Sequence, residues 1–425
     1  MANSTKINLI EAVCQSWSEN CADHFSCEIA LSGGLDSVVL LHLLCSIRHR
    51  FNINLSAIHV HHGLQKVADD WVVFCQKLCH QYQVPLRVEY VNVDSNSSLG
   101  IEGEARAQRY QKFSGSVATV IAMAHHLDDQ IETFFLSLLR GGGVRGMSAM
   151  PVIRNFNHKT LWRPLLQFPR KQLEEYAKTH NLPYVQDPSN ADTNYLRNWL
   201  RHQLLPQCDK RITSFQSHIE SDIRSMQNAL ATIDEIAKND LSDICPCDEV
   251  LNVSKWKELS LSRREEVLHQ FIKKQVLGSV NTHLLQDISK HLFRQTKQHY
   301  WQLSAGNLYL QYDFLWFFCG TIPENCVQWR LAEKGLPESL IKKLHLRKVE
   351  PDDVLPTKIG HKNVIKLLQE RKIPLFIRKH WQVLVDENDI CRAVVNIRCD
   401  ENESIDNGYI PAIPQLNRYL MELYS

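Results

Sequence analysis

The sequence predicts an α/β protein with a doubly wound, mainly parallel sheet, followed by a mainly helical middle domain and a small α+β C-terminal domain. From residue 27 to about 187, short β-branched runs alternate with segments whose apolar residues recur every three or four positions, as a parallel sheet with crossover helices requires. After residue 206 long, polar-rich helical stretches take over, and a β-rich segment and a basic region follow. We therefore expect domains at residues 1–210, 211–326 and 327–425.

The individual elements follow from the same patterns, in chain order. Strands are predicted at residues 28–32, 55–61, 86–93 and 119–125, where β-branched residues gather. Helices are predicted between these strands at residues 38–49, 68–82 and 102–117, and beyond them at 215–238. A β-rich segment is predicted at residues 300–320.

Composition limits the classes of function. The chain has 425 residues, of which 44% are hydrophobic and 22% charged, so it can bury substantial cores. No apolar run approaches the roughly 18 to 20 residues of a membrane span and the N-terminus lacks the layout of a signal peptide, so we expect a cytoplasmic protein with no membrane partner. The thirteen scattered cysteines favour reduced thiols over disulfides. With a net charge of +1, a nucleic-acid partner requires a local basic patch.

The first chemical motif is SGGLDS, residues 32–37, between the first predicted strand and the first predicted helix. Gly33 and Gly34 can adopt φ > 0 or let a ligand approach the backbone, and the amide N–H groups at the helix start favour an anion such as phosphate. No lysine follows the glycines, which excludes the P-loop of kinases and GTPases. An ordinary capped turn is the alternative.

This motif resembles the pyrophosphate-binding loop of the N-type ATP pyrophosphatase superfamily, whose members cleave ATP between the α and β phosphates and transfer AMP to an oxygen. The resemblance implies that ATP is bound by Ser32, Gly33, Gly34, Leu35, Asp36 and Ser37. Asp36 would also help to hold Mg²⁺, because a hard cation on phosphates prefers carboxylate oxygen.

Histidines end the second predicted strand in HVHHGL, residues 59–64. His59 and His61 fall on one face of the strand, but no cysteine or carboxylate stands at ligand spacing nearby. Ligands of open α/β sheets bind at the carboxyl ends of the strands, so we expect these histidines to line a nucleotide crevice rather than to bind zinc.

Two arginines lie three residues apart on the predicted helix 102–117. Guanidinium groups at Arg106 and Arg109 share neighbouring surface positions, an arrangement that suits phosphates. The alternative is a solvated helix face on which they pair with Glu102 and Glu104.

The stretch AHHLDDQIET, residues 124–133, carries an imidazole and carboxylates. His125, Asp129 and Glu132 follow the spacing i, i+4, i+7, which predicts one helical face near the end of the strand 119–125. Carboxylates in such a place bind Mg²⁺, hold a substrate ammonium or accept a proton from an amine, and a histidine neutralises phosphate charge. A simple cluster at a helix N-cap is the alternative.

Taken in order, several motifs resemble the tRNA(Ile)-lysidine synthetase family. They are SGGLDS, HVHHGL, EARAQRY, AHHLDDQIET, RGGG, RPLL and DPSNADTNYLRNWLR, the last of which carries Arg197 and Arg201 four residues apart. The resemblance is close over residues 29–201 and returns at residues 360–391, which resemble the family's C-terminal domain. The region between them matches only in position and character.

The resemblance implies an adenine-nucleotide alpha-hydrolase-like fold and a two-step ligation. ATP adenylates the carbonyl oxygen of the wobble cytidine in the CAU anticodon of tRNA(Ile), and free L-lysine then displaces AMP, so that the tRNA reads AUA instead of AUG. The roles carried over are as follows: catalysis for Asp36, His125, Arg106 and Arg109, lysine recognition for Asp129 and Glu132, and phosphate or tRNA contact for Arg197 and Arg201.

A basic segment follows in the C-terminal region. Residues 330–379 hold thirteen Lys/Arg against six Asp/Glu. The candidate phosphate contacts are Lys342, Lys343, Arg347 and Lys348. An ordinary solvated surface is the alternative, because Glu350, Asp352 and Asp353 interrupt the patch.

Three other functions stay open at this point. A tRNA thiolase would activate the base in the same way, but such enzymes commonly need paired cysteines or an iron–sulfur cluster, and the chain has no CxxC motif. A small-molecule amidating synthetase would need an ammonia route, and an RNA-binding protein would need an inactive nucleotide site. The sequence does not assign the oligomeric state, for which a homodimer is one option. It also does not show how tRNA(Ile) is distinguished from tRNA(Met).

Overall fold

The computed structural model describes residues 8–63, 68–92, 97, 100–188, 192–276, 280–294, 298–320 and 327–420, except the side chain of residue 102. It divides into two compact units, Met1–Ala231 and Thr232–Ser425, each described separately below. Leu64 of the HVHHGL motif and residues 189–191 of the DPSNAD stretch lie outside the described residues. Within the described ranges, no helix is both long enough and apolar enough to cross a membrane.

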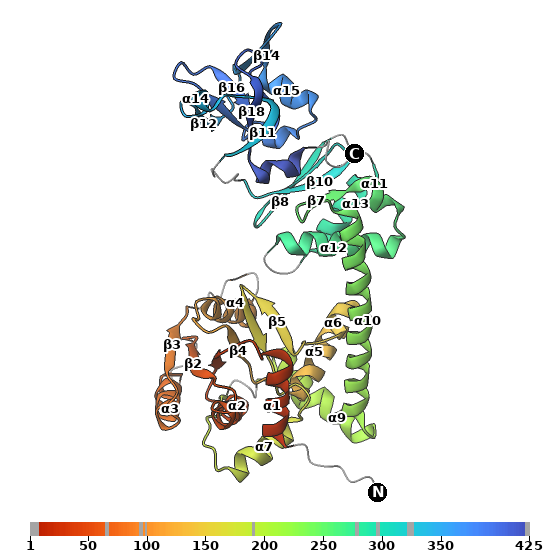
Figure 1. Ribbon diagram of the computed structural model, residues 1–425. Coiled ribbons are helices and arrows are strands. Elements are labelled where there is room, and N and C mark those ends of the chain that lie inside the picture. The colour runs from red at the N-terminus through yellow and green to blue at the C-terminus, as the bar shows by residue number, and fades with distance from the viewer. Residues whose placement is uncertain are drawn as a thin grey trace. The chain divides into compact units, whose positions relative to one another are not determined.

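The first unit is built on a six-stranded sheet with strand order β3-β2-β1-β4-β6-β5 (Figure 1). Its strands are β1 (Ser26–Ala30), β2 (Asn54–His61), β3 (Leu86–Tyr90), β4 (Val120–Ala122), β5 (Ile153–Phe156) and β6 (Lys159–Trp162). Only the β5–β6 pair is antiparallel, so the predicted mainly parallel sheet is confirmed. Strand β1 pairs with β2 on one side and with β4 on the other. The strand order therefore reverses at β1, and such a switch point opens a crevice at the carboxyl ends of the strands.

Helices cover both faces of this sheet. They are α1 (Leu9–Asn20), α2 (Leu35–Ile47), α3 (Ala68–Gln81), α4 (Gly100–Ser114), α5 (Leu127–Leu139), α6 (Gly143–Met147), α7 (Arg170–Thr179), α8 (Leu196–Trp199) and α9 (Leu205–Arg211), with a π-helical turn at Leu200–Leu204. Successive strand residues alternate between two cores: Val120 and Ala122 pack with α1 and α2, whereas Ile121 packs with Phe113 of α4. The predicted doubly wound arrangement is therefore confirmed.

The long helix α10 (Phe215–Ile244) contains the boundary between the two units. The second unit continues with a four-stranded antiparallel sheet of order β7-β10-β9-β8. Its strands are β7 (Val250–Asn252), β8 (His299–Leu303), β9 (Gly306–Gln311) and β10 (Phe314–Phe318), and its helices are α11 (Val253–Glu258), α12 (Leu261–Gln275) and α13 (Thr282–Phe293). Strands β8 to β10 coincide with the predicted β-rich segment.

The C-terminal part of the second unit is rich in strands. These are β11 (Gln328–Gly335), β12 (His345–Lys348), β13 (Val354–Thr357), β14 (Gly360–Asn363), β15 (Gln382–Val385), β16 (Cys391–Val394), β17 (Arg398–Cys399) and β18 (Ile405–Ala412), with short helices α14 (Glu338–Ile341), α15 (Val364–Glu370) and α16 (Leu375–Arg378) and a 3₁₀ turn at Pro414–Tyr419.

Strand β10 belongs to both cores of the second unit. Leu315 and Phe317 pack with the helices α11 to α13, whereas Trp316 and its neighbours two residues away pack with Trp381 and the C-terminal strands. Because alternate side chains of β10 point to opposite sides, this one strand packs against both the helical part and the strand-rich part. The boundary predicted near residue 326 stays a prediction.

Candidate active site

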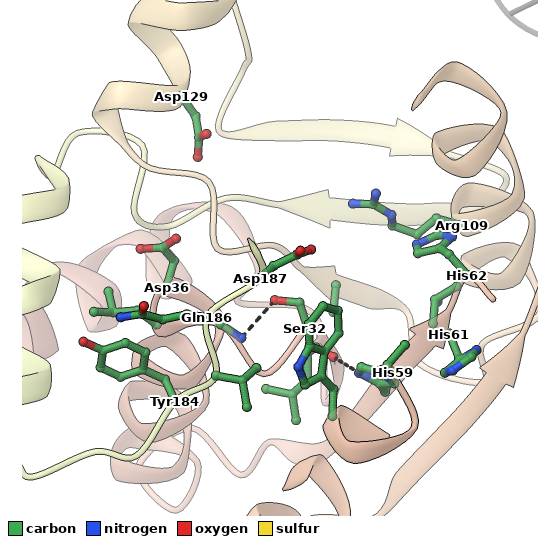
Figure 2. Close-up of a pocket in the computed structure, with 18 of the residues that line it drawn as sticks. Ser32, Asp36, His59, His61, His62, Arg109, Asp129, Tyr184, Gln186 and Asp187 are labelled. Carbon is green, nitrogen blue, oxygen red and sulfur yellow. Dashed lines mark hydrogen bonds between the residues drawn. The ribbon is translucent and has the colours of Figure 1, made fainter. Parts of the chain in front are cut away.

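A cavity of about 1010 Å³ lies at the carboxyl ends of β1 and β2 (Figure 2). Its wall includes seven of the residues that the sequence singled out: Ser32, Gly34, Leu35, Asp36, Arg109, Asp129 and Arg201. The remaining six in the first unit do not line it: Gly33, Ser37, Arg106, His125, Glu132 and Arg197. The histidines at the end of β2 line it as expected.

The SGGLDS loop is held by its own hydrogen bonds. The N–H of Gly34 donates to Oγ of Ser32 at 3.3 Å, and Oγ of Ser37 donates to the carbonyl of Gly34 at 2.9 Å. Gly33 has φ of +86°, and a Cβ there would lie 3.1 Å from Cγ2 of Val185, so glycine is required. Among the residues that the structure describes, no side chain caps α2 at its start, which leaves the first-turn N–H groups available to an anion.

Asp36 offers an unsatisfied carboxylate oxygen to the cavity. Its Oδ1 is buried and accepts no hydrogen bond from the described residues. Burial raises the pKa of Asp36, against the opposing charges of His126 and Arg170. A buried carboxylate oxygen without a donor is a suitable ligand for a hard cation, so the donor set present fits Mg²⁺.

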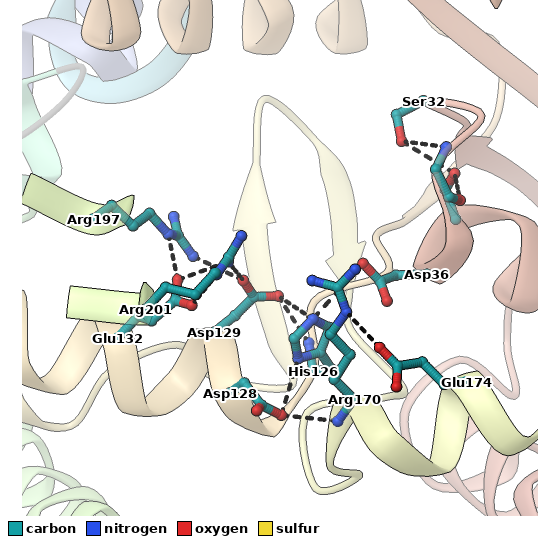
Figure 3. A network of polar contacts seen from close by, with 12 residues as sticks. Ser32, Asp36, His126, Asp128, Asp129, Glu132, Arg170, Glu174, Arg197 and Arg201 are labelled. Carbon is teal, nitrogen blue, oxygen red and sulfur yellow. Dashed lines mark hydrogen bonds and ion pairs between the residues drawn. The ribbon is translucent and has the colours of Figure 1, made fainter. Parts of the chain in front are cut away.

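His126, rather than His125, lies between the carboxylates (Figure 3). Helix α5 begins at Leu127 with His126 as its N-cap, so the predicted helical face contains Asp129 and Glu132 but not His125. That part of the prediction was wrong because the spacing i, i+4 assumes a helix that begins two residues earlier. Burial lowers the pKa of His125 to about 3, so its imidazole is neutral.

The contacts of His126 favour the imidazolium form. Nε2 lies 3.7 Å from Oδ2 of Asp36 and 3.5 Å from Oδ2 of Asp129, and Nδ1 lies 3.5 Å from Oδ2 of Asp128. Burial alone would lower the pKa of His126, but the close contact with Asp128 and the negative charges of Asp129 and Asp36 raise it. Nothing in the spacing of the motif distinguishes this histidine from its neighbour His125.

Two arginines pair with two of the three carboxylates of α5, Asp129 and Glu132. Arg197 donates from Nε to Glu132 at 2.7 Å and from Nη2 to Asp129 at 2.9 Å. Arg201 donates from Nε to the other oxygen of Glu132 at 2.6 Å. The side chain of Glu132 is only 1% exposed, whereas Asp129 and Arg201 reach the cavity wall. The residues predicted to contact lysine and those predicted to contact phosphate therefore form one ion-pair cluster (Figure 3).

Burial and neighbouring cations act against each other on Asp129. Burial acts to raise the pKa of this carboxyl group, but the charges of His126 and Arg197 outweigh it and hold the pKa below its ordinary value. Asp129 is therefore ionised at neutral pH.

The helix α4 places its two arginines differently. Arg109 lines the cavity, and burial together with the charge of Arg109 lowers the pKa of His62 to about 4. Arg106 instead donates to the hydroxyl of Tyr110 at 3.2 Å and lies over its ring. Glu104 accepts hydrogen bonds from Ser97 and Gln108, and the side chain of Glu102 lies outside the described residues.

The other two histidines at the end of β2 have protein partners of their own. Nδ1 of His59 bonds to the carbonyl of Leu31 at 2.8 Å, and Nε2 of His61 lies 3.3 Å from Asp69. Both therefore shape the cavity wall, as expected from their place at the strand end.

The cavity also contains residues to which the sequence assigned no role. Arg170 donates its backbone N–H to Asp128 at 2.8 Å, and its charge favours the ionised form of Asp36. The segment 184–188 forms a further part of the wall and is tied to the loop by a bond from the N–H of Val185 to the carbonyl of Gly33. The only available signal was position: Arg170 follows RPLL in the motif series, and the segment runs into the start of DPSNAD, whose first residues are Asp187 and Pro188.

The loop and cavity define the class of protein, which is one that carries a PP-loop domain. A family model with that description matches residues 6–208. Over 408 residues, 91% of this chain and 91% of the relative, the chain is 37% identical to a tRNA(Ile)-lysidine synthase from Neisseria gonorrhoeae. A relative of the same name from Chromobacterium violaceum is 33% identical over 434 residues, 95% of this chain and 98% of that relative. The chain belongs to the tRNA(Ile)-lysidine synthase family, which confirms the resemblance.

The comparison with solved structures adds a distant likeness. A U34-tRNA thiolase from Methanococcus maripaludis shares 18% sequence identity at a TM-score of 0.44, over 52% of this chain and 78% of that chain. A likeness of this size carries no argument about activity.

Proposed function

We propose that this protein ligates L-lysine to the wobble cytidine of the CAU anticodon of tRNA(Ile), with ATP converted to AMP and pyrophosphate. Family membership supports the reaction. One cavity brings together a glycine-rich anion loop, an oxygen of Asp36 that accepts no hydrogen bond from the described residues, and Asp129 and Arg201, which form an ion-pair cluster with Glu132 and Arg197 behind the wall. This combination is the strongest support for the reaction. ATP, lysine and tRNA are all present in the cytoplasm, where we place the protein.

The first step is adenylation of the base. The cytosine carbonyl oxygen attacks the α phosphorus, the bond to the β-phosphate oxygen breaks, and pyrophosphate leaves. The first-turn N–H groups of α2 bind the pyrophosphate part, Asp36 holds Mg²⁺, and Arg109 balances charge on the phosphates. When bound, Mg²⁺ neutralises part of the triphosphate charge. His126 then helps to balance charge near Asp36, whereas the buried His125 is neutral.

The second step is attack by the lysine amine on the activated ring carbon, from which AMP leaves with the former carbonyl oxygen. Free lysine has a pKa near 10.4, so the ammonium must lose a proton before it attacks. Asp129 is ionised and lies at the cavity wall, where it can hold the ammonium and accept this proton. Glu132 can contact the lysine ammonium together with Asp129 only when Arg197 and Arg201 no longer occupy its two carboxylate oxygens. We propose that phosphate or tRNA binds these two arginines and so breaks their ion pairs with Glu132. Lysine binding would then be coupled to binding of the nucleic acid.

The second unit offers contacts for the tRNA backbone. Lys342, Lys343 and Lys348 are exposed, although Lys342 pairs with Glu338 at 3.0 Å. Burial lowers the pKa of His380, and the positive charges of Lys379 and Lys348 lower it further. His380 lines a second cavity of about 990 Å³. The exposed Lys379 lines this cavity. Exposed lysines suit phosphates, and phosphate contacts position a nucleic acid without reading its sequence.

Arg347 has another role. It donates to both oxygens of Asp353, at 2.7 and 2.8 Å, and to Asp389 at 3.0 Å. The guanidinium therefore joins β12 to the turns around it, and we assign it to the stability of the C-terminal part rather than to tRNA.

A tRNA thiolase is the second candidate function, because it activates the base in the same way. None of the residues that line the described cavity wall is a cysteine, whereas sulfur delivery commonly uses paired cysteines or an iron–sulfur cluster. The wall thus favours an amine as the second substrate.

Pyrophosphate release tests the first step. We expect the protein with ATP and Mg²⁺ to release pyrophosphate when a tRNA(Ile) transcript with the CAU anticodon is added, and AMP when lysine follows. A transcript with the anticodon UAU is the matched control and should release neither. Pyrophosphate release that does not depend on tRNA would contradict activation of the wobble base.

A further inference from the structure

A compact group of metal-ligating side chains lies in the second unit, apart from the residues used above. Asp287 and His291 belong to α13, and His299 begins β8 (Figure 1). Each offers one ligand atom, and these three atoms lie within 4.8 Å of one another. No role in the proposed reaction involves these residues.

Sequence spacing and packing bring the three side chains together. Asp287 and His291 are separated by four residues on α13, which puts them on one helical face. The ring of His299 stacks on that of His291, with centroids 4.1 Å apart and an angle of 19° between the planes. Together with Asp287, the two rings bring one carboxylate oxygen and two imidazole nitrogens within 4.8 Å of one another.

Two further hydrogen bonds orient the ligands. The indole N–H of Trp301 donates to Oδ2 of Asp287 at 2.7 Å, and Nδ1 of His291 donates to the backbone carbonyl of Asp287 at 2.9 Å. The second bond fixes the proton of a neutral His291 on Nδ1 and so places the ring lone pair on Nε2. Such outer bonds are typical of metal-ligating histidines and carboxylates.

We propose that Asp287, His291 and His299 bind a first-row transition dication, with Zn²⁺ as the representative ion. Two imidazoles and one carboxylate suit zinc, whereas Mg²⁺ prefers oxygen ligands alone. Asp287 is exposed and the histidines are half-buried, so the ion can enter and water can complete its coordination. Because the ligands come from consecutive elements, the ion joins the end of α13 to the start of β8 and stabilises this part of the second unit.

Zinc titration of the full-length protein, purified without a histidine tag and stripped with a chelator, tests the site. His291→Ala and His299→Ala should each bind one equivalent of Zn²⁺ fewer than the wild type. His283→Ala is the matched control, because His283 is exposed on the same helix and belongs to no such cluster in the described residues. Equal zinc stoichiometry in all four proteins would overturn the proposal, since other cysteines and histidines would then account for the binding.

A second variant separates ligation from a purely structural role. Trp301→Phe keeps the three ligands but removes the hydrogen bond to Asp287, and it should weaken zinc affinity about 10- to 100-fold while leaving the stoichiometry unchanged. Zinc should also raise the midpoint of thermal unfolding of the wild type and of His283→Ala, but not of His299→Ala. An equal rise in all of them would contradict the assignment of the ion to these residues.

Discussion

His126 and Asp36 face each other across the start of α5 and the start of α2, with Nε2 of the histidine 3.7 Å from Oδ2 of the carboxylate. The histidine comes from the end of β4 and the carboxylate from the loop after β1, two strands that are neighbours in the sheet. The pair therefore connects the phosphate-binding loop to the carboxylate and arginine cluster, and most of the predictions below concern one side of it or the other.

Asp36→Asn should abolish activity without weakening the fold. The substitution keeps the shape of the side chain but removes the charge proposed to hold Mg²⁺, so we expect kcat to fall about 10²- to 10³-fold. Burial raises the pKa of Asp36, so its ionised form is disfavoured by folding and contributes no stability at pH 7. Urea unfolding should show a free energy of unfolding equal to or above that of the wild type. A clear loss of stability would show that Asp36 has a structural role instead.

His126 should make stability depend on pH. Its pKa is raised above the ordinary value of 6.5, so the stabilisation is fully present below pH 6.5 and is lost as pH rises through the folded-state pKa. We expect the difference in free energy of unfolding between the wild type and His126→Gln to shrink from pH 6 towards pH 9. His125→Gln is the control of opposite sign: His125 is neutral in the folded protein but protonates below about pH 6.5 in the unfolded chain, so the wild type should gain stability relative to this variant as pH rises from 6. A constant difference across these pH values would contradict the charged state assigned to His126.

Glu132→Gln should destabilise the first unit. It removes the charge that Arg197 and Arg201 share, and breaking a buried ion pair costs about 3 to 5 kcal/mol, with the lower end expected here because both arginines are partly exposed. The matched control is Glu174→Gln, which removes an exposed partner of Arg170 and should cost less than about 1 kcal/mol. Chemical denaturation measures the loss in free energy of unfolding for each variant. Equal losses would mean that the buried cluster stabilises the protein no more than an exposed ion pair does.

Lys343 and Arg347 should separate tRNA binding from stability. Lys343→Ala removes an exposed cation, so it should weaken tRNA binding and reduce the slope of log affinity against log salt by about 1, with unfolding unchanged. Arg347→Ala breaks the pairs with Asp353 and Asp389 and should lower the unfolding midpoint. Filter binding at several salt concentrations and thermal unfolding distinguish the two, and an unchanged salt slope for Lys343→Ala would remove this lysine from the interface.

Local patterns predicted the frame of the first unit. The loop at residues 32–37, the parallel strands and the helices between them follow from short-range periodicity and from glycine at Gly33, whose positive φ the structure requires. The family resemblance supplied the remaining motifs. The antiparallel β5–β6 hairpin was not predicted, because its two short strands carry no strong alternation.

The sequence patterns did not predict which residues of different motifs contact one another in the fold. Whether His125 or His126 faces Asp36 depends on where α5 begins, and such boundaries are uncertain by a few residues in any reading of a sequence. The pairing of Arg197 with Glu132 joins residues 65 positions apart, and that of Arg347 with Asp389 joins residues 42 apart. Charge spacing along the chain identifies candidate cations but not their partners, which only the folded arrangement supplies.

Transfer of lysine to the tRNA directly tests the proposed ligation. The protein is mixed with ATP, Mg²⁺, radiolabelled lysine and tRNA(Ile) transcripts carrying the CAU anticodon, with Asp36→Ala as the inactive control and tRNA(Met) as the competing substrate. We expect label on the wobble cytidine of tRNA(Ile), none with the variant, and release of AMP in equal amount. ATP consumption in the presence of tRNA without any lysine label would contradict the proposed ligation and point to sulfur or ammonia as the second substrate.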